Sequence, residues 1–199
     1  MKIFIDGEPF FPSSPEAEES KQQLLSEIDE EIFKKGLTYT TITIDGVEVD
    51  ASAFLRMRQG REAHFTTYKI RSLVIESLEE ATNYLPRLIN GIQKITSDLE
   101  RKDNENISEN LTNFSEGLDW LVNVMQKSQI LLKVRDSDLS DDKEETMARL
   151  NKSLESITDC FEKGQMMEIA FHMRHGILPG IKIISGYINK LLETAKLMQ

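Results

Sequence analysis

The chain has 199 residues, of which 39% are hydrophobic and 29% charged, and its formal net charge at pH 7 is −10. This length allows one large domain or two small ones, and either can bury a hydrophobic core. The acidic balance argues against a nucleic-acid partner, whose phosphates require a basic face, and the lack of about 18 consecutive apolar residues argues against a membrane partner.

Two Asp-Gly pairs divide the first fifty residues into short β-type runs. Asp6-Gly7 lies within residues 2–10, and Asp45-Gly46 lies within residues 41–49. A tight hairpin turn needs positive φ at its centre, which glycine adopts without strain. We therefore predict a β-hairpin at each pair.

Between the two hairpins, residues 14–35 have helical spacing. Ser14 is a suitable N-cap, Pro15 suits the first helical position, and Gly36 would supply a left-handed stop. Apolar residues recur on one face of this segment: Leu24, Leu25, Ile28, Ile32 and Phe33. Such a face predicts a helix that covers a sheet.

Residues 1–69 therefore follow the order strand, strand, helix, strand, strand, short helix and strand. The last four elements are predicted at residues 38–44, 47–49, 52–57 and 64–70, from their side-chain types and spacing. This order resembles the β-grasp (ubiquitin-like) superfamily, and the opening Met1–Pro9 resembles its sulfur-carrier members. Those carriers end in a free Gly-Gly tail, whereas the last strand here leads into a helix, so we do not expect a carrier function. An accessory sheet without β-grasp topology is the alternative.

From residue 70 onward the pattern is helical. One apolar seam lies on a predicted helix of about thirty residues. It consists of Ile70, Val74, Leu78, Ala81, Leu85, Leu88, Ile92, Ile95 and Leu99. Pro86 should kink this helix or remove one of its hydrogen bonds.

Three more helices are predicted after this one. They cover residues 107–134, 147–161 and 166 onward, with an acidic loop at residues 136–142 and a bend at Pro179-Gly180. Short connections favour antiparallel neighbours. The fold class is therefore α+β, with a β-grasp-like module at residues 1–69 and an antiparallel four-helix bundle at residues 70–199.

Glu168, His172 and His175 form the nearest approach to a metal site. Offsets of three and four residues place side chains on one helical face, where a carboxylate and two imidazoles could bind a metal ion. A di-metal bundle needs a comparable motif on a second helix, and the glutamates of the first long helix lie away from its seam. A polar, pH-responsive helix face is therefore the favoured interpretation, and metal binding is the alternative.

The last helix also carries a methionine-rich apolar segment. Its candidate partner-binding residues are Met166, Met167, Met173 and Ile177. Methionine adapts to irregular surfaces and is common where proteins bind several partners. We predict that part of this segment faces a protein partner or the N-terminal module.

Three other features have less specific interpretations. Trp120 could anchor a partner, although packing among the helices is favoured. The single cysteine, Cys160, is predicted to be a small buried hydrophobe and fits a reducing, cytoplasmic compartment. The cluster Arg56, Arg58 and Arg61 is predicted to be a solvated turn.

The function favoured by the sequence is a non-enzymatic, cytoplasmic protein-interaction module, an adaptor or chaperone-like protein with an unknown protein partner and no cofactor. No Gly-rich phosphate loop and no Gly-x-Ser-x-Gly elbow occurs. The turn at residues 99–106, between two helices, resembles flagellar export chaperones, which are helical bundles that wrap a flagellin tail. Two alternatives stay open: a metal-binding or enzymatic protein that uses Glu168, His172 and His175, and a homodimer that closes an open seam on the first long helix.

Overall fold

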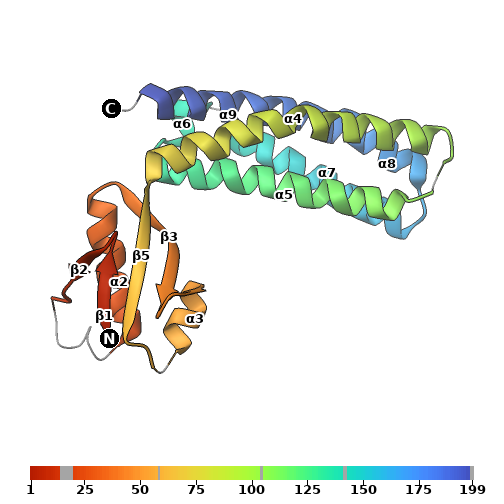
Figure 1. Cartoon of the computed structure of the whole chain (residues 1–199). Coiled ribbons are helices and arrows are strands. Elements are labelled where there is room, and N and C mark those ends of the chain that lie inside the picture. The colour runs from red at the N-terminus through yellow and green to blue at the C-terminus, as the bar shows by residue number, and fades with distance from the viewer. Residues whose placement is uncertain (14–19, 58, 104, 141–142, 198–199) are drawn as a thin grey trace. The chain divides into compact units, whose positions relative to one another are not determined.

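The computed structural model describes residues 1–13, 20–57, 59–103, 105–140 and 143–197, and it divides into two compact units, Met1–Leu73 and Val74–Gln199 (Figure 1). The first unit is α+β and the second is helical. The junction predicted after residue 69 is the point where β5 (Glu62–Lys69) ends and α4 (Ile70–Glu100) begins. Ser14 and Pro15, the predicted start of the first helix, lie outside the described residues.

A five-stranded mixed sheet forms the centre of the first unit. Its strands are β1 (Lys2–Ile5), β2 (Glu8–Phe10), β3 (Leu37–Ile44), β4 (Val47–Val49) and β5, in the spatial order β2-β1-β5-β3-β4. Strand β1 runs parallel to β5, with Ile3 opposite Ala63, and the other pairings are antiparallel. This topology is compatible with a β-grasp-like module.

Both Asp-Gly pairs form the predicted turns. Asp6 and Gly7 have φ values of 51° and 84°, and Asp45 and Gly46 have 49° and 83°. Positive φ at both central residues is the primed-turn geometry that matches the twist of a hairpin. Each aspartate also ties its turn to β5. The Asp6 carboxylate accepts from the backbone N–H of Thr67 at 2.8 Å, and the Asp45 carboxylate accepts from that of Glu62 at 3.0 Å.

The hydrophobic core of this unit lies between the sheet and its two described helices, α2 (Lys21–Lys34) and α3 (Ala51–Arg56). The predicted apolar face of α2 buries Leu24, Ile28 and Ile32, whereas Phe33 is exposed. The rings of Phe54 in α3 and Phe65 in β5 meet edge to face at 5.5 Å. After α2, Gly36 has a φ of 70°, which confirms the predicted left-handed stop.

The second unit consists of helices that lie side by side (Figure 1). After α4 come α5 (Ile107–Leu132), α6 (Asp136–Leu139), α7 (Lys143–Glu162), α8 (Met166–His172), the π-helical turn η1 (Met173–Ile177) and α9 (Leu178–Leu197). The short helix α6 lies within the predicted acidic loop, of which Asp141 and Asp142 are outside the described residues. Helix α4 continues through Pro86, whose side chain is exposed.

The predicted seam of α4 is buried within the chain. Every seam residue from Val74 to Leu99 is at most 4% exposed, and Ile70 is half-buried. The helices of this same chain therefore already cover the seam. The buried seam therefore gives no support to a homodimer that would close it.

The predicted bend at Pro179-Gly180 is wrong in position. The irregularity lies one turn earlier, in η1, where the N–H of Leu178 bonds to the carbonyl of Met173, five residues back. Pro179 has no N–H to donate to the carbonyl four residues before it, so the α-helical ladder is broken here. The wide turn of η1 accommodates the break, and the helix continues as α9.

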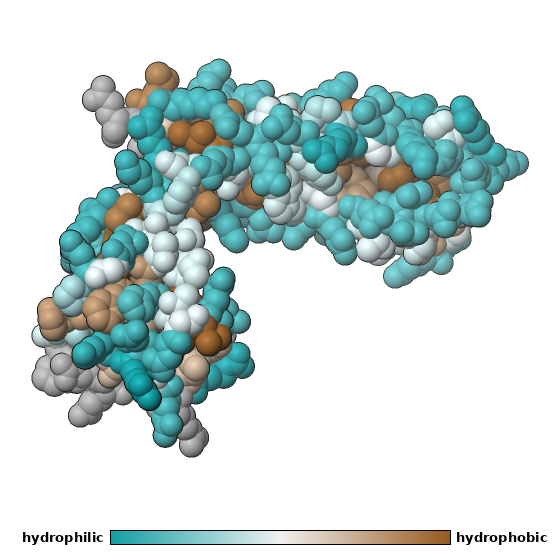
Figure 2. All heavy atoms as spheres, viewed as in Figure 1, coloured by the Kyte–Doolittle hydropathy of each residue, from teal (hydrophilic) through white to brown (hydrophobic). Residues whose placement is uncertain are grey.

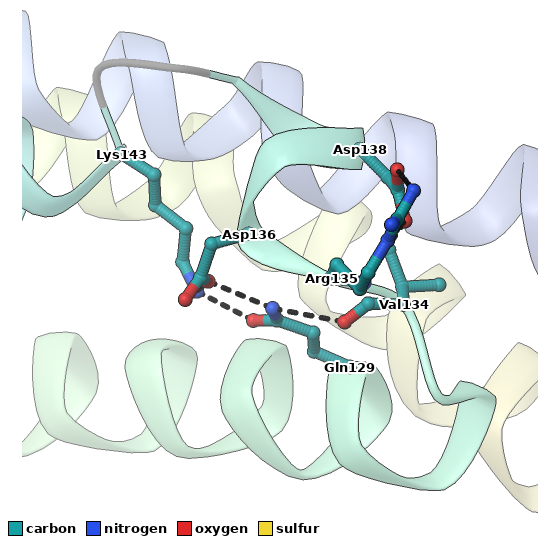
Figure 3. A network of polar contacts seen from close by, with 6 residues as sticks. All are labelled: Gln129, Val134, Arg135, Asp136, Asp138 and Lys143. Carbon is teal, nitrogen blue, oxygen red and sulfur yellow. Dashed lines mark hydrogen bonds and ion pairs between the residues drawn. The ribbon is translucent and has the colours of Figure 1, made fainter.

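A polar network connects α5, α6 and the start of α7 (Figure 3). The Gln129 amide donates to the Val134 carbonyl at 3.1 Å and to the Asp136 carboxylate at 2.8 Å, and the Lys143 ammonium donates to both Gln129 and Asp136. These bonds, with Gln129 first and Lys143 second, lower the pKa of Asp136 below its ordinary value of 3.8. We assign the network a structural role, because its charges and amides are paired with one another.

Candidate binding groove between α4 and α5

Helices α4 and α5 border a pocket of about 710 Å³ that lies entirely within the helical unit. Its lining includes Glu76, Glu79, Glu80 and Tyr84 from α4, and Glu116, Gly117 and Trp120 from α5. Positions four apart on a helix share a face, so Glu76, Glu80 and Tyr84 line one side, and Glu116 and Trp120 line the other. The sequence thus repeats the same arrangement, an aromatic residue preceded by glutamate, on both walls.

An aromatic pair stands at the centre of this pocket. The rings of Tyr84 and Trp120 meet edge to face, with centroids 5.3 Å apart and an interplanar angle of 81°. Both residues are half-buried, so part of each side chain stays accessible. This geometry gives two rings that are held in place and still available for contact.

Gly117 makes the approach of Tyr84 to α5 possible. A Cβ atom built on Gly117 would lie 1.9 Å from the Tyr84 hydroxyl oxygen, far inside van der Waals contact. The hydroxyl thus occupies the space that any other residue would fill with its side chain. A glycine inside a helix costs about 1 kcal/mol relative to alanine, and here the close approach of Tyr84 requires it.

The pocket lining is acidic. It contains four glutamates and one arginine, Arg87, so its formal charge is −3. One cation of the chain already lies against it, because the Lys196 ammonium of α9 is 2.6 Å from the Glu79 carboxylate. Exposed ion pairs of this kind contribute little to stability. The pair nevertheless shows that a cation is accommodated at this edge.

A second pocket, of about 190 Å³, extends the first one along the same two helices. The two pockets share Tyr84, Arg87 and Asn113, and the second adds Lys94 and the apolar side chains of Leu88, Ile95 and Phe114. We call the two pockets together the α4–α5 groove. It is acidic and aromatic at its Glu76 end, and basic and apolar at its Lys94 end. From residue 76 to residue 95 the groove follows about 28 Å of helix, at 1.5 Å per residue.

The predicted metal residues are not brought together as a site. Among the described residues, no group of three His, Cys, Asp or Glu side chains could hold a metal ion. Glu168 and His175 are exposed and His172 is half-buried. Both imidazoles lie against the ring of Phe171, at centroid distances of 5.7 Å for His172 and 4.7 Å for His175.

The methionine-rich segment is divided between core and surface. Met173 and Ile177 are 0% exposed, so they are core side chains and cannot form the docking face predicted for them. Met166 is half-buried, whereas Met167 is 56% exposed. Phe171 is also 56% exposed and lies one turn after Met167. The surface that remains here is therefore smaller than the sequence predicted.

The remaining sequence features take ordinary positions. Cys160 is buried and unpaired, as predicted for a small hydrophobe. Arg56 and Arg61 are exposed, and Arg58 lies outside the described residues. On the face drawn in Figure 2, hydrophilic side chains cover most of the helical unit and the hydrophobic areas are small. None of the helices that the structure describes is apolar over a stretch long enough to cross a membrane.

Comparison with known proteins places the helical unit in a family. Residues 76–186 match the domain of unknown function DUF8042, and this range is more than half of the chain. The chain belongs to the DUF8042 family. The matched range contains the whole lining of the α4–α5 groove and none of the sheet. No curated protein and no solved structure matched the chain.

Sequence reasoning missed the α4–α5 groove although its elements are visible in the sequence. The glutamates of α4 are predicted only to lie away from its seam, and Trp120 is predicted without the tyrosine that it contacts. The available signal was Gly117, a glycine inside a strong helical pattern three residues before a tryptophan. No sequence pattern marks Tyr84 as part of the groove, because only the packing of α4 on α5 places it over Gly117.

Proposed function

We propose that this protein is a non-enzymatic protein-interaction module, adaptor-like or chaperone-like, in which an antiparallel four-helix bundle presents the α4–α5 groove to a segment of a partner protein. The observation that supports the proposal is the half-buried pair of Tyr84 and Trp120 in a pocket of about 710 Å³. The N-terminal unit is in this proposal a β-grasp-like module, a fold that by itself assigns no function.

The aromatic pair of Tyr84 and Trp120 is the first feature that suits a protein partner. Tryptophan, tyrosine and arginine are enriched among the residues that contribute most to protein interfaces. The rings of tryptophan and tyrosine bury a large area and lose few rotamers. Here the two rings are carried by two long helices, so their positions are fixed before a partner arrives. Preorganisation of this kind reduces the entropy that binding must offset.

The length of the groove also suits a segment of a protein chain. About 28 Å of groove accommodates about eight or nine residues of an extended chain at about 3.3 Å per residue. A single small molecule would leave most of that length unoccupied. The groove therefore favours a peptide-like occupant over a metabolite.

The test compares two glycine-to-alanine variants that differ in what the added methyl group meets. Gly117→Ala places a methyl group where the Tyr84 hydroxyl lies and so displaces the aromatic pair. Gly186→Ala, in α9, places the same methyl group in open space, because nothing lies within 4 Å of its Cβ. Both variants change glycine to alanine inside a helix, so helix propensity is matched.

Wild-type protein, Gly117→Ala and Gly186→Ala are each used to recover partners from native lysate, and the recovered protein is then purified and its affinity for all three is measured. We expect Gly186→Ala to bind like the wild type and Gly117→Ala to bind at least about tenfold more weakly. A wild type that recovers nothing above background, or a partner that binds both variants equally, would contradict the proposal.

A further inference from the structure

We infer that the acidic, aromatic end of the α4–α5 groove binds an arginine side chain of the partner segment. This inference rests on the proposed function and goes further, because it names the chemical group that enters the pocket. The inference depends on one observation: the aromatic side chains of Tyr84 and Trp120 line the same pocket as the carboxylates of Glu80 and Glu116.

The charge of the lining selects a cation. Four glutamates and one arginine line the pocket, so an acidic side chain would be repelled and an apolar one would strip water from carboxylates without pairing them. Lys196 already lies against Glu79 from the side of α9. A cation from outside would face Glu80 and Glu116, which are both exposed and line opposite walls.

The aromatic pair selects arginine among cations. The guanidinium group is planar, stacks on aromatic rings and keeps its edge N–H groups free to donate to carboxylates. Two half-buried rings with carboxylates one helical turn away offer both contacts at once. An ammonium group can use the charge, but it has no plane to stack.

The other end of the groove sets a second requirement. Arg87 and Lys94 line it, so a segment that is basic along its whole length would be repelled there. Ten residues of helix separate Tyr84 from Lys94, which is about 15 Å, or about five residues of an extended segment. The fitting segment therefore carries an arginine and, about five residues away, a carboxylate.

The probe is the peptide acetyl-Arg-Ala-Ala-Ala-Ala-Glu-amide, titrated into the full-length protein. Trp120 is the single tryptophan, so the spectrum of ¹⁵N-labelled protein contains one indole N–H signal, and that signal reports on the pocket. A peptide with citrulline in place of arginine has the same shape without the charge. We expect a shift of the Trp120 signal that saturates with the arginine peptide, and affinity at least about tenfold lower with the citrulline peptide.

Two double variants test whether the arginine peptide binds at this pocket. Glu80→Gln with Glu116→Gln removes two charges from the lining, and Glu155→Gln with Glu144→Gln removes two from exposed positions of α7. We expect at least about fivefold weaker binding of the arginine peptide to the first pair only. Because all four side chains are exposed, both pairs should fold as the wild type does.

Two results would overturn the inference. One is equal affinity for the arginine and citrulline peptides. The other is an equal loss of affinity for the arginine peptide in the two double variants, which would mean that binding depends only on the net charge of the chain. Either result leaves the proposed function intact if a purified partner still distinguishes Gly117→Ala from Gly186→Ala. If the partner does not distinguish those variants, the proposed function itself fails.

Discussion

Replacing Gly176 with alanine should make the helical unit about 1–3 kcal/mol less stable than the same replacement at Gly186. Gly176 lies in η1, against α7. A Cβ atom there would be 2.2 Å from the Ser153 hydroxyl oxygen and 2.8 Å from the Ser153 Cβ. The hydroxyl can rotate away, but the Cβ is fixed to the backbone of α7, so the two helices must separate.

The magnitude follows from two opposing contributions. Alanine is about 1 kcal/mol more favourable than glycine inside a helix, and Gly186→Ala should gain this in full, because its methyl group meets nothing within 4 Å. Gly176→Ala gains the same amount and loses about 1–3 kcal/mol to overpacking. Gly117→Ala should lie between them, because the clashing atom is the far end of the Tyr84 side chain, which can move at lower cost.

Urea unfolding followed by circular dichroism at 222 nm measures these differences, since the signal is mainly helical. A rescue variant tests the cause: Ser153→Gly removes both clashing atoms and should recover at least about 1 kcal/mol in the Gly176→Ala background relative to its effect in the wild type. The close packing of η1 on α7 would be refuted if Gly176→Ala were as stable as Gly186→Ala.

Three further predictions concern single positions. Gly46→Val should lower the free energy of unfolding by about 1–3 kcal/mol, because Gly46 has a φ of 83° and a β-branched residue resists that region; unchanged thermal stability would contradict the turn. Met173→Glu should unfold the helical unit, because Met173 is 0% exposed and the glutamate would be buried without a partner; a folded variant, judged by circular dichroism, would show that the segment is surface. Asp136→Asn should destabilise at pH 7, and this effect should diminish as the pH falls below 3.8. The pKa of Asp136 in the folded state is lowered by Gln129 and Lys143, so its stabilisation is fully present above 3.8 and is lost as the pH falls through the folded value. Urea unfolding at pH 7 and at a series of lower pH values measures this, and an effect that does not change with pH would contradict it.

Much of the fold could be predicted from local patterns. The turns at Asp6-Gly7 and Asp45-Gly46 and the stop at Gly36 were predictable because positive φ is a property of single residues, and a few residue types dominate it. The seam of α4 was predictable because its period is that of helix packing, and every seam residue from Val74 to Leu99 is buried.

Burial on the last helix could not be predicted in the same way. Met167 and Met173 have the same side chain and similar neighbours in sequence, yet one is 56% exposed and the other 0%. Six positions are about 240° apart around an α-helix, so the helical period places these two methionines on different sides. It does not say which side faces the core, and that was decided by the packing of α8 and η1 on α7.

The sequence by itself therefore determined an α+β chain with hairpins fixed by Asp-Gly turns, a long helix with one buried seam, and an acidic surface. Tertiary structure alone decided which acidic and aromatic residues share a groove. Tyr84 and Trp120 are separated by 36 positions, and their contact depends on how closely α4 approaches α5. That distance is set by the absence of a side chain at Gly117, and no local pattern states which side chain will occupy the space that a glycine leaves.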